Sequence, residues 1–370
     1  MREKNADRDD YHLANQRRCG TRTPKHLKNL AKPRHIRRNP SPGPLARLAA
    51  RDWQNSSRCI GESRRLLHLG TYNCVIEMKV SVAQVGSVLF DTPATLNRVE
   101  RLCGVAAAGG AALVVFPEAL LGGYPKALTF GATVGNRTEE GRELFLRYSN
   151  AAILCPGPET ELLANRAKEL NLHIVIGVIE RAGGTLYCSS LLFSPNDGLL
   201  FKHRKLVPTA SERLIWGQGD GSTMQVVQTE IGCLGMAICW ENYMPLYRQH
   251  LYEQGVQLWC APTVDAREMW QTSMRHIAYE GRCFVLSACQ VLTKEDWPED
   301  LREAGGTIDG RSMVISPKGE VLTQPLTGEG ALFAEIDLDD IQRGKFDLDV
   351  AGHYNRLDVF SLRVRDGSEE

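Results

Sequence analysis

The chain has 370 residues and no formal net charge, because 44 Lys and Arg balance 44 Asp and Glu. A content of 43% hydrophobic and 24% charged residues is typical of a globular protein and excludes a largely disordered chain. The charge is nevertheless uneven: residues 1–77 hold 17 basic and 7 acidic residues, so residues 78–370 carry the matching acidic excess.

Residues 1–77 show no sustained helix or strand period and are rich in Arg, Asn, Ser and Pro. We interpret them as a basic extension, separate from the functional domain at residues 78–370. We expect the functional chain to begin at Met78, the first methionine after Met1. A transit peptide is disfavoured because four acidic residues lie among the first ten. A nucleic-acid-binding arm is the alternative, although no aromatic residues interleave with the basic ones.

Regular apolar periods begin at Met78. They predict strands at residues 79–85, 112–116, 173–180, 185–194 and 199–205. They also predict a helix that begins at Asp91 or Thr92 and ends before Gly109, followed by helices at residues 139–153 and 159–170. Short turns join the last three strands, so this part of the chain is predicted to form a meander.

The second half repeats the alternation of strands and helices. It predicts strands at residues 223–229, 233–239, 258–262, 284–290, 312–317 and 331–338. Helices are expected near residues 243–254 and 266–282. Strands that alternate with helices and are interrupted by hairpins predict an α/β domain with a mixed sheet and helices outside it.

The cysteines and the apolar segments indicate the cellular setting. The 11 cysteines include no Cys-x-x-Cys pair, and the stretch from Val105 to Phe116 is too short to span a membrane. The N-terminus also lacks the apolar segment of a secretory signal. We therefore expect a cytoplasmic protein with reduced thiols, no zinc site and no membrane contact.

Three reactive side chains lie where a predicted strand stops, which is where α/β proteins concentrate their functional residues. The first is Glu118 in the sequence VVFPEALLGGYPK. A carboxyl group so close to buried surface is expected to have a raised pKa, as a general acid or base near neutral pH requires. A solvated or helix-capping carboxylate is the alternative.

The second and third are Lys205 and Cys239. Lys205 closes a strand in HRKLVPTASERLIWGQGDG, and Glu212 follows seven residues later. Cys239 closes the predicted strand 233–239 in ICWENYMPLYR, at a strand-to-helix turn that resembles a nucleophile elbow. The other body cysteines are predicted to be buried thiols.

Together and in this order, the three motifs resemble the nitrilases of the carbon–nitrogen hydrolase superfamily. The resemblance runs from about Lys79 to Phe360. It implies an α-β-β-α sandwich that pairs across a helical face into a homo-oligomer. Gly310-Arg311-Ser312 is a departure, since many relatives have Gly-Gly-Ser there.

The resemblance also implies the roles of the site residues. The family's Glu–Lys–Cys triad falls on Glu118, Lys205 and Cys239, and its additional glutamate falls on Glu212. The substrate is then a nitrile, hydrolysed with water to a carboxylic acid and ammonia through a cysteine thioimidate and thioester, without metal or organic cofactor. Aromatic side chains near the motifs are expected to contact the substrate, namely Tyr124, Trp216 and Trp240, with a place in the hydrophobic core as the alternative for Tyr124 and Trp216.

Alternatives stay open within and beyond this chemistry. A cyanide-hydrolysing or amide-hydrolysing (amidase or carbamoylase) activity would use the same groups. His203, two residues before Lys205, points to the same strand face and could reach the site, whereas His276 on the helix at 266–282 is expected to pack or to support the site and not to act as a general base. The non-enzyme alternative is a nucleic-acid-associated protein that acts through residues 1–77.

Overall fold

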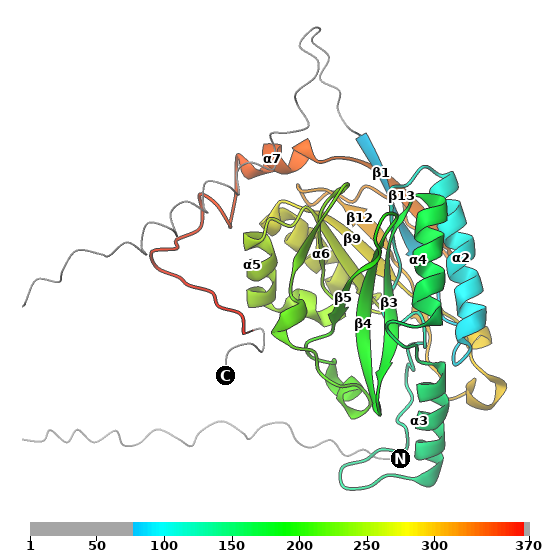
Figure 1. Cartoon of the computed structure of the whole chain (residues 1–370). Helices are drawn as coiled ribbons and strands as arrows, with labels where there is room; N and C mark the ends of the chain where they lie inside the picture. The colour runs from blue at the N-terminus through cyan, green and yellow to red at the C-terminus, as the bar shows by residue number, and fades with distance from the viewer. Residues whose placement is uncertain (1–76, 366–370) are drawn as a thin grey trace, which may run out of the picture. The chain divides into compact units, whose positions relative to one another are not determined.

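The computed structural model describes residues 77–365 of the chain (Figure 1). The predicted basic extension, apart from Glu77, lies outside the described residues. In the described part, no helix is both long enough and apolar enough to cross a membrane.

The first sheet contains the predicted meander and the first βαβ unit. Its strand order is β13-β1-β2-β3-β4-β5. The bounds are β1 Glu77–Gln84, β2 Leu113–Val115, β3 His173–Ala182, β4 Thr185–Ser194, β5 Gly198–Arg204 and β13 Gly330–Asp337. Strands β1, β2 and β3 run parallel, and the other neighbours pair antiparallel. The mixed sheet predicted from the strand pattern is therefore confirmed.

The second sheet has the same mixture of directions. Its order is β12-β9-β8-β7-β6, and β7, β8 and β9 are parallel. The bounds are β6 Val226–Thr229, β7 Gly232–Met236, β8 Leu258–Thr263, β9 Phe284–Cys289 and β12 Met313–Ile315. A separate short ribbon, which the sequence analysis missed, pairs β10 Val291–Leu292 with β11 Ile308–Asp309.

Five of the six α-helices in the described residues begin and end close to the predicted residues, and the last one, α7, was not predicted. Their bounds are α2 Thr92–Ala108, α3 Glu139–Ala151, α4 Pro158–Leu170, α5 Pro245–Glu253, α6 Glu268–Gly281 and α7 Asp339–Lys345. Helix α2 illustrates why: the Asp91 carboxylate accepts the Ala94 N–H at 2.9 Å, and Pro93 occupies the first turn. An N-cap acceptor and an early proline are the signals that define such a start.

Strand alternation sends side chains into two different layers of the core. On β1, Val80 and Val82 face the second sheet, whereas Ala83 packs in the cluster beneath α2 and α4. A third cluster lies between the second sheet and the helices α5 and α6. Helices thus cover the outer face of each sheet, and the two sheets pack on one another (Figure 1). The predicted α-β-β-α sandwich is confirmed.

Candidate active site

Glu118 lies in a buried segment that follows β2. Phe116 donates its N–H to Val175, and Leu120 donates to Gly177, so this segment continues along β3 beyond the end of the regular strand. Gly177 is required for that approach, because an added Cβ would lie 2.5 Å from the Cα of Glu118. The Glu118 carboxyl is held fully out of solvent at this point.

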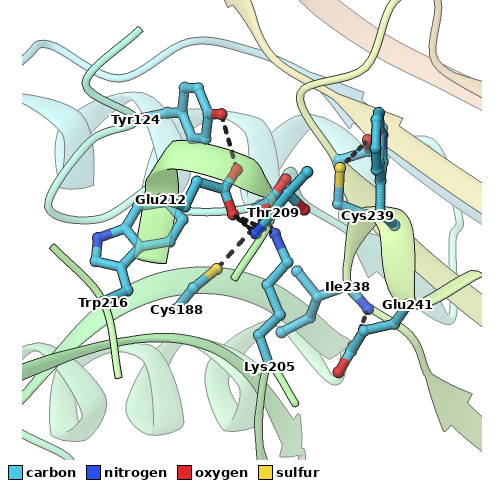
Figure 2. A network of polar contacts seen from close by, with 12 residues as sticks. Tyr124, Cys188, Lys205, Thr209, Glu212, Trp216, Ile238, Cys239 and Glu241 are labelled. Carbon is cyan, nitrogen blue, oxygen red and sulfur yellow. Dashed lines mark hydrogen bonds and ion pairs between the residues drawn. The ribbon is translucent and has the colours of Figure 1, made fainter. Parts of the chain in front are cut away.

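Lys205 follows β5 and extends into the same buried space. Its Nζ lies 2.6 Å from Oε1 of Glu118 and 2.8 Å from Oε2 of Glu212, so one ammonium bridges two carboxylates. Figure 2 shows Lys205 and Glu212 together in this polar network. Glu212 belongs to the 3₁₀ helix Ala210–Leu214 and accepts two further hydrogen bonds, from the Thr209 N–H at 2.6 Å and the Tyr124 hydroxyl at 2.8 Å. The structure therefore brings Glu118 against Lys205 and Glu212, which lie 87 and more positions further along the chain.

The two oxygens of Glu118 have different surroundings. Oε1 accepts from Lys205 and also from the Cys188 thiol at 3.6 Å, whereas Oε2 is buried without a hydrogen-bond partner among the described residues. Burial raises the pKa of Glu118 above its ordinary range, and the Lys205 ammonium opposes that rise. Oε2 is thus a buried carboxylate oxygen that is able to accept a proton.

The charge of Lys205 follows from the same contacts. Burial is the largest influence and alone would lower its pKa, but the surrounding acidic groups, Glu118 foremost among them, together outweigh it and raise the pKa of Lys205 well above its ordinary value. The side chain consequently stays an ammonium, which a buried lysine without acidic neighbours would not.

Cys239 stands at the turn between β7 and a 3₁₀ helix, Cys239–Tyr243. The predicted strand 233–239 was too long, since β7 ends at Met236. Cys239 adopts φ of 49°, in the left-handed region that non-glycine residues seldom occupy. Asn242 fixes the turn by donating to the carbonyls of Ala237 and Cys239, each at 2.8 Å. Strain held in place by such contacts is a common feature of functional sites.

The Cys239 thiol belongs to the same electrostatic cluster. Thr263, at the end of β8, donates its hydroxyl to Sγ at 3.2 Å. Burial raises the pKa of Cys239 well above its ordinary value, with Glu118 adding to the rise and Lys205 opposing it. The resting sulfur is therefore a neutral thiol, which needs a base if it is to attack.

Glu241 ties the Cys239 turn to the Lys205 segment. Its carboxylate accepts the Ile238 N–H and the Leu206 N–H, both at 2.6 Å, and lies 3.0 Å from Nε2 of His203. His203 therefore contacts Glu241, and no hydrogen bond joins it to Glu118, Lys205 or Cys239 in the described residues. His276 was expected to pack or to support the site; the packing prediction was wrong, because its side chain is 60% exposed beside Glu280.

A cavity of about 660 Å³ opens onto Cys239. Tyr124, Glu212 and Trp240 line it, and the Trp240 indole donates to Asp265 at 3.0 Å. Trp216 lines a second cavity of about 330 Å³, which shares Tyr124 and Glu212 with the first. Two of the three predicted substrate-contacting aromatics therefore border the Cys239 cavity, and Trp216 borders its neighbour.

Comparison with known proteins decides the family. Residues 79–346 match the carbon–nitrogen hydrolase family, more than half of the chain. The chain belongs to the carbon–nitrogen hydrolases.

Individual members of that family are similar over most of their length. An arylacetonitrilase of Trametes versicolor is 50% identical over 310 residues, covering 78% of this chain and 97% of that protein. An aliphatic nitrilase of Sinorhizobium fredii is 51% identical over 295 residues, covering 78% and 96%. The solved carbon–nitrogen hydrolase of Helicobacter pylori shares the fold, with a TM-score of 0.61 at 20% identity, covering 77% of this chain and 97% of that one.

Several contacts of this hydrolase site were not anticipated. Cys188 was predicted to be a buried thiol, which is confirmed, but its contact with Glu118 was not foreseen. Thr263 was missed although it ends a strand, which is the signal that singled out the three predicted residues. Gln290, which donates to the Glu118 carbonyl at 2.7 Å, has no local sequence signal because it lies 172 positions away.

We predict that Glu241→Gln destabilises the fold, because an amide cannot accept at both of the positions that bind the Ile238 and Leu206 N–H groups. Leaving a buried donor unpaired costs about 1–3 kcal/mol. Urea denaturation measures the change, with the exposed Glu303→Gln as the matched control. An equal stability of the two variants would contradict the bridging role of Glu241.

Proposed function

We propose that this chain is a nitrilase that converts a nitrile and two waters to a carboxylic acid and ammonia, with Cys239 as the nucleophile. The observation that carries the proposal is the site itself. A thiol facing a cavity lies beside a buried carboxylate with one free oxygen, and an ammonium is held between two carboxylates. The names of the two similar nitrilases support the same substrate class.

The first step is the attack of sulfur on the nitrile carbon. A nitrile reacts slowly with water, so a sulfur nucleophile is needed. Glu118 takes the thiol proton as the C–S bond forms and passes it to the nitrile nitrogen, which gives a thioimidate. Cys239 has a raised pKa, so this proton transfer accompanies the attack instead of preceding it.

Two waters complete the reaction. The first, activated by Glu118, adds to the thioimidate carbon and gives a tetrahedral intermediate. Loss of ammonia then leaves a thioester on Cys239, and the second water releases the carboxylic acid and restores the thiol. If the intermediate expels sulfur instead of ammonia, the product is the amide, so the acid-to-amide ratio reports how this intermediate divides.

Lys205 stabilises the charge that develops on the intermediates, and Glu212 holds Lys205 in position. The Lys205 ammonium stabilises the negative charge of the intermediates, a contribution of about 3–4 kcal/mol if it resembles an oxyanion-hole donor. Glu212 holds Lys205 at 2.8 Å and is itself oriented by Thr209 and Tyr124. These groups suffice for the hydrolysis, so the proposal includes no cofactor. Among residues 77–365, no cluster of three or more His, Cys, Asp or Glu is arranged to hold a metal ion.

The direct test combines variants with a nitrile panel. Cys239→Ala removes the nucleophile and Glu118→Gln removes the base, so each is expected to lower nitrile turnover at least 100-fold while keeping the fold. Ammonia, acid and amide are measured with aliphatic, aryl, arylacetyl and cyanide substrates, and with amides. Turnover of amides alone, or nitrile turnover that survives Cys239→Ala, would overturn the proposal.

The pH dependence tests the setting of Glu118. As the pH falls through the raised pKa of Glu118, the base becomes protonated and activity is lost. The pKa of the Cys188 thiol is raised well above its ordinary value by burial, so it stays a donor that favours the ionised carboxylate. Cys188→Ala should therefore shift the acid limb of kcat/KM upward by about 0.5 pH unit. Cys188→Ser keeps a donor and should leave the limb near that of the wild type; equal shifts in both variants would contradict this role.

We also propose that the protein pairs through the face formed by α5 and α6. Leu246 on α5 and Met269 on α6 are 68% and 64% exposed, which is unusual for large apolar side chains on neighbouring helices. The double variant Leu246→Glu, Met269→Glu should lower the mass measured by light scattering. Leu146→Glu on α3, 52% exposed in the wild type, is the control. A wild-type monomer, or a double variant of unchanged mass, would contradict the pairing.

A further inference from the structure

We infer that Lys126 and Arg311 bind a carboxylate group on the substrate, so that the preferred substrates are nitriles with an anionic group away from the reacting carbon. This inference rests on the proposed nitrile hydrolysis and narrows it to a substrate class. Both side chains line the cavity that opens onto Cys239.

The two cations have no anionic partner within the protein. In the described part of the chain, no hydrogen bond or ion pair reaches the side-chain nitrogens of Lys126 or Arg311. Arg267 is the third basic residue that lines this cavity. It is instead neutralised by Asp265, with its nitrogens at 2.8 and 2.5 Å from the two carboxylate oxygens. Glu212 is likewise paired with Lys205.

Two further acidic residues, Glu268 and Asp309, line the cavity, and neither forms an ion pair with Lys126 or Arg311. Glu268 begins α6, where a negative charge is favoured by the helix dipole. Asp309, on β11, is exposed and makes no ion pair with Lys126 or Arg311. The side chains of Lys126 and Arg311 therefore remain free to form ion pairs with a carboxylate group of the substrate.

Arg311 is held in a costly conformation at this wall. Its φ is 75°, in the region that favours glycine. The neighbouring backbone is fixed by Gln84, which accepts the Ser312 N–H at 2.9 Å and lies so close to Gly310 that an added Cβ would be 2.5 Å away. A side chain kept at a strained position on the cavity that Cys239 also lines indicates a functional contribution.

Lys126 is held in position by packing of its aliphatic carbons and by its backbone, and not by an ion pair. Its Cγ packs against Gly306, where an added Cβ would lie 2.4 Å away, and its carbonyl accepts the Gly306 N–H at 3.0 Å. Lys126 is half-buried and lines both cavities. A cation that is partly desolvated and unpaired gains most from an anionic ligand.

The test compares matched nitriles with the full-length protein. Each ω-cyanocarboxylate with two to four methylenes, and each (cyanomethyl)benzoate, is paired with the alcohol in which CH₂OH replaces the carboxylate. Ammonia release reports nitrile hydrolysis alone. The wild type should favour at least one carboxylate over its alcohol by about tenfold or more in kcat/KM, mainly through KM. Added salt should reduce this preference.

Variants separate charge from backbone strain. Lys126→Met keeps the stem on Gly306 without the ammonium, and Arg311→Gly and Arg311→Ala both remove the guanidinium. All three should lose most of the carboxylate preference and stay within about twofold of the wild type on the alcohols. Arg311→Gly should have a higher thermal midpoint than Arg311→Ala, because only glycine relieves the strained φ.

The assays distinguish a failure of the carboxylate-binding inference from a failure of the proposed nitrile hydrolysis. If alcohols and carboxylates are hydrolysed equally well and Cys239→Ala abolishes both, the nitrilase assignment stands and this inference is wrong. A preference for ω-cyanoalkylamines would also overturn it, since Asp309 and Glu268 would then dominate. If no nitrile is hydrolysed, the proposed function fails and the inference fails with it.

Discussion

The ion-pair cluster of Lys205 with Glu118 and Glu212 is the constraint on which the rest of the site depends. A buried ammonium is stable only when carboxylates surround it, and a buried carboxylate keeps a charge only beside a cation. Here one cation serves two acids, and Glu118, whose pKa is raised by burial, keeps one oxygen free of hydrogen bonds within the described residues. The same arrangement supplies a base and a fixed positive charge, which are the two properties that attack on a nitrile requires.

The fold makes this cluster by joining the ends of strands from two different sheets. Glu118 and Lys205 follow β2 and β5 of the first sheet, whereas Cys239 follows β7 of the second sheet and Thr263 ends its strand β8. Because the two sheets share one core, a shift of either sheet would separate the thiol from its base. Glu241 opposes such a shift by binding N–H groups on both sides of the boundary.

The sequence predicts the strands of the two sheets, the helices α2 to α6 and the four central residues, because periodicity and strand ends are local properties, but it does not predict the short β10–β11 ribbon or α7. It does not predict which atoms meet. The contact of Gln290 with Glu118, the thiol of Cys188 on Oε1 and the left-handed turn at Cys239 depend on packing between distant segments. Strand 233–239 was predicted too long because the apolar pattern continues through Ala237 and Ile238, where the chain has already left the sheet. The charged wall at Lys126 and Arg311 likewise becomes visible only when its two segments meet at one cavity.

The most direct measurement of the central claim is the mass of the enzyme caught during turnover. The protein is mixed with a slowly hydrolysed nitrile, quenched in acid and digested, and the cysteine peptides are analysed by mass spectrometry. The account predicts a thioimidate or thioester adduct on the peptide that contains Cys239, and loss of that adduct in Cys239→Ala. An adduct on Cys188 or another cysteine, or turnover with the Cys239 peptide unmodified throughout, would contradict it.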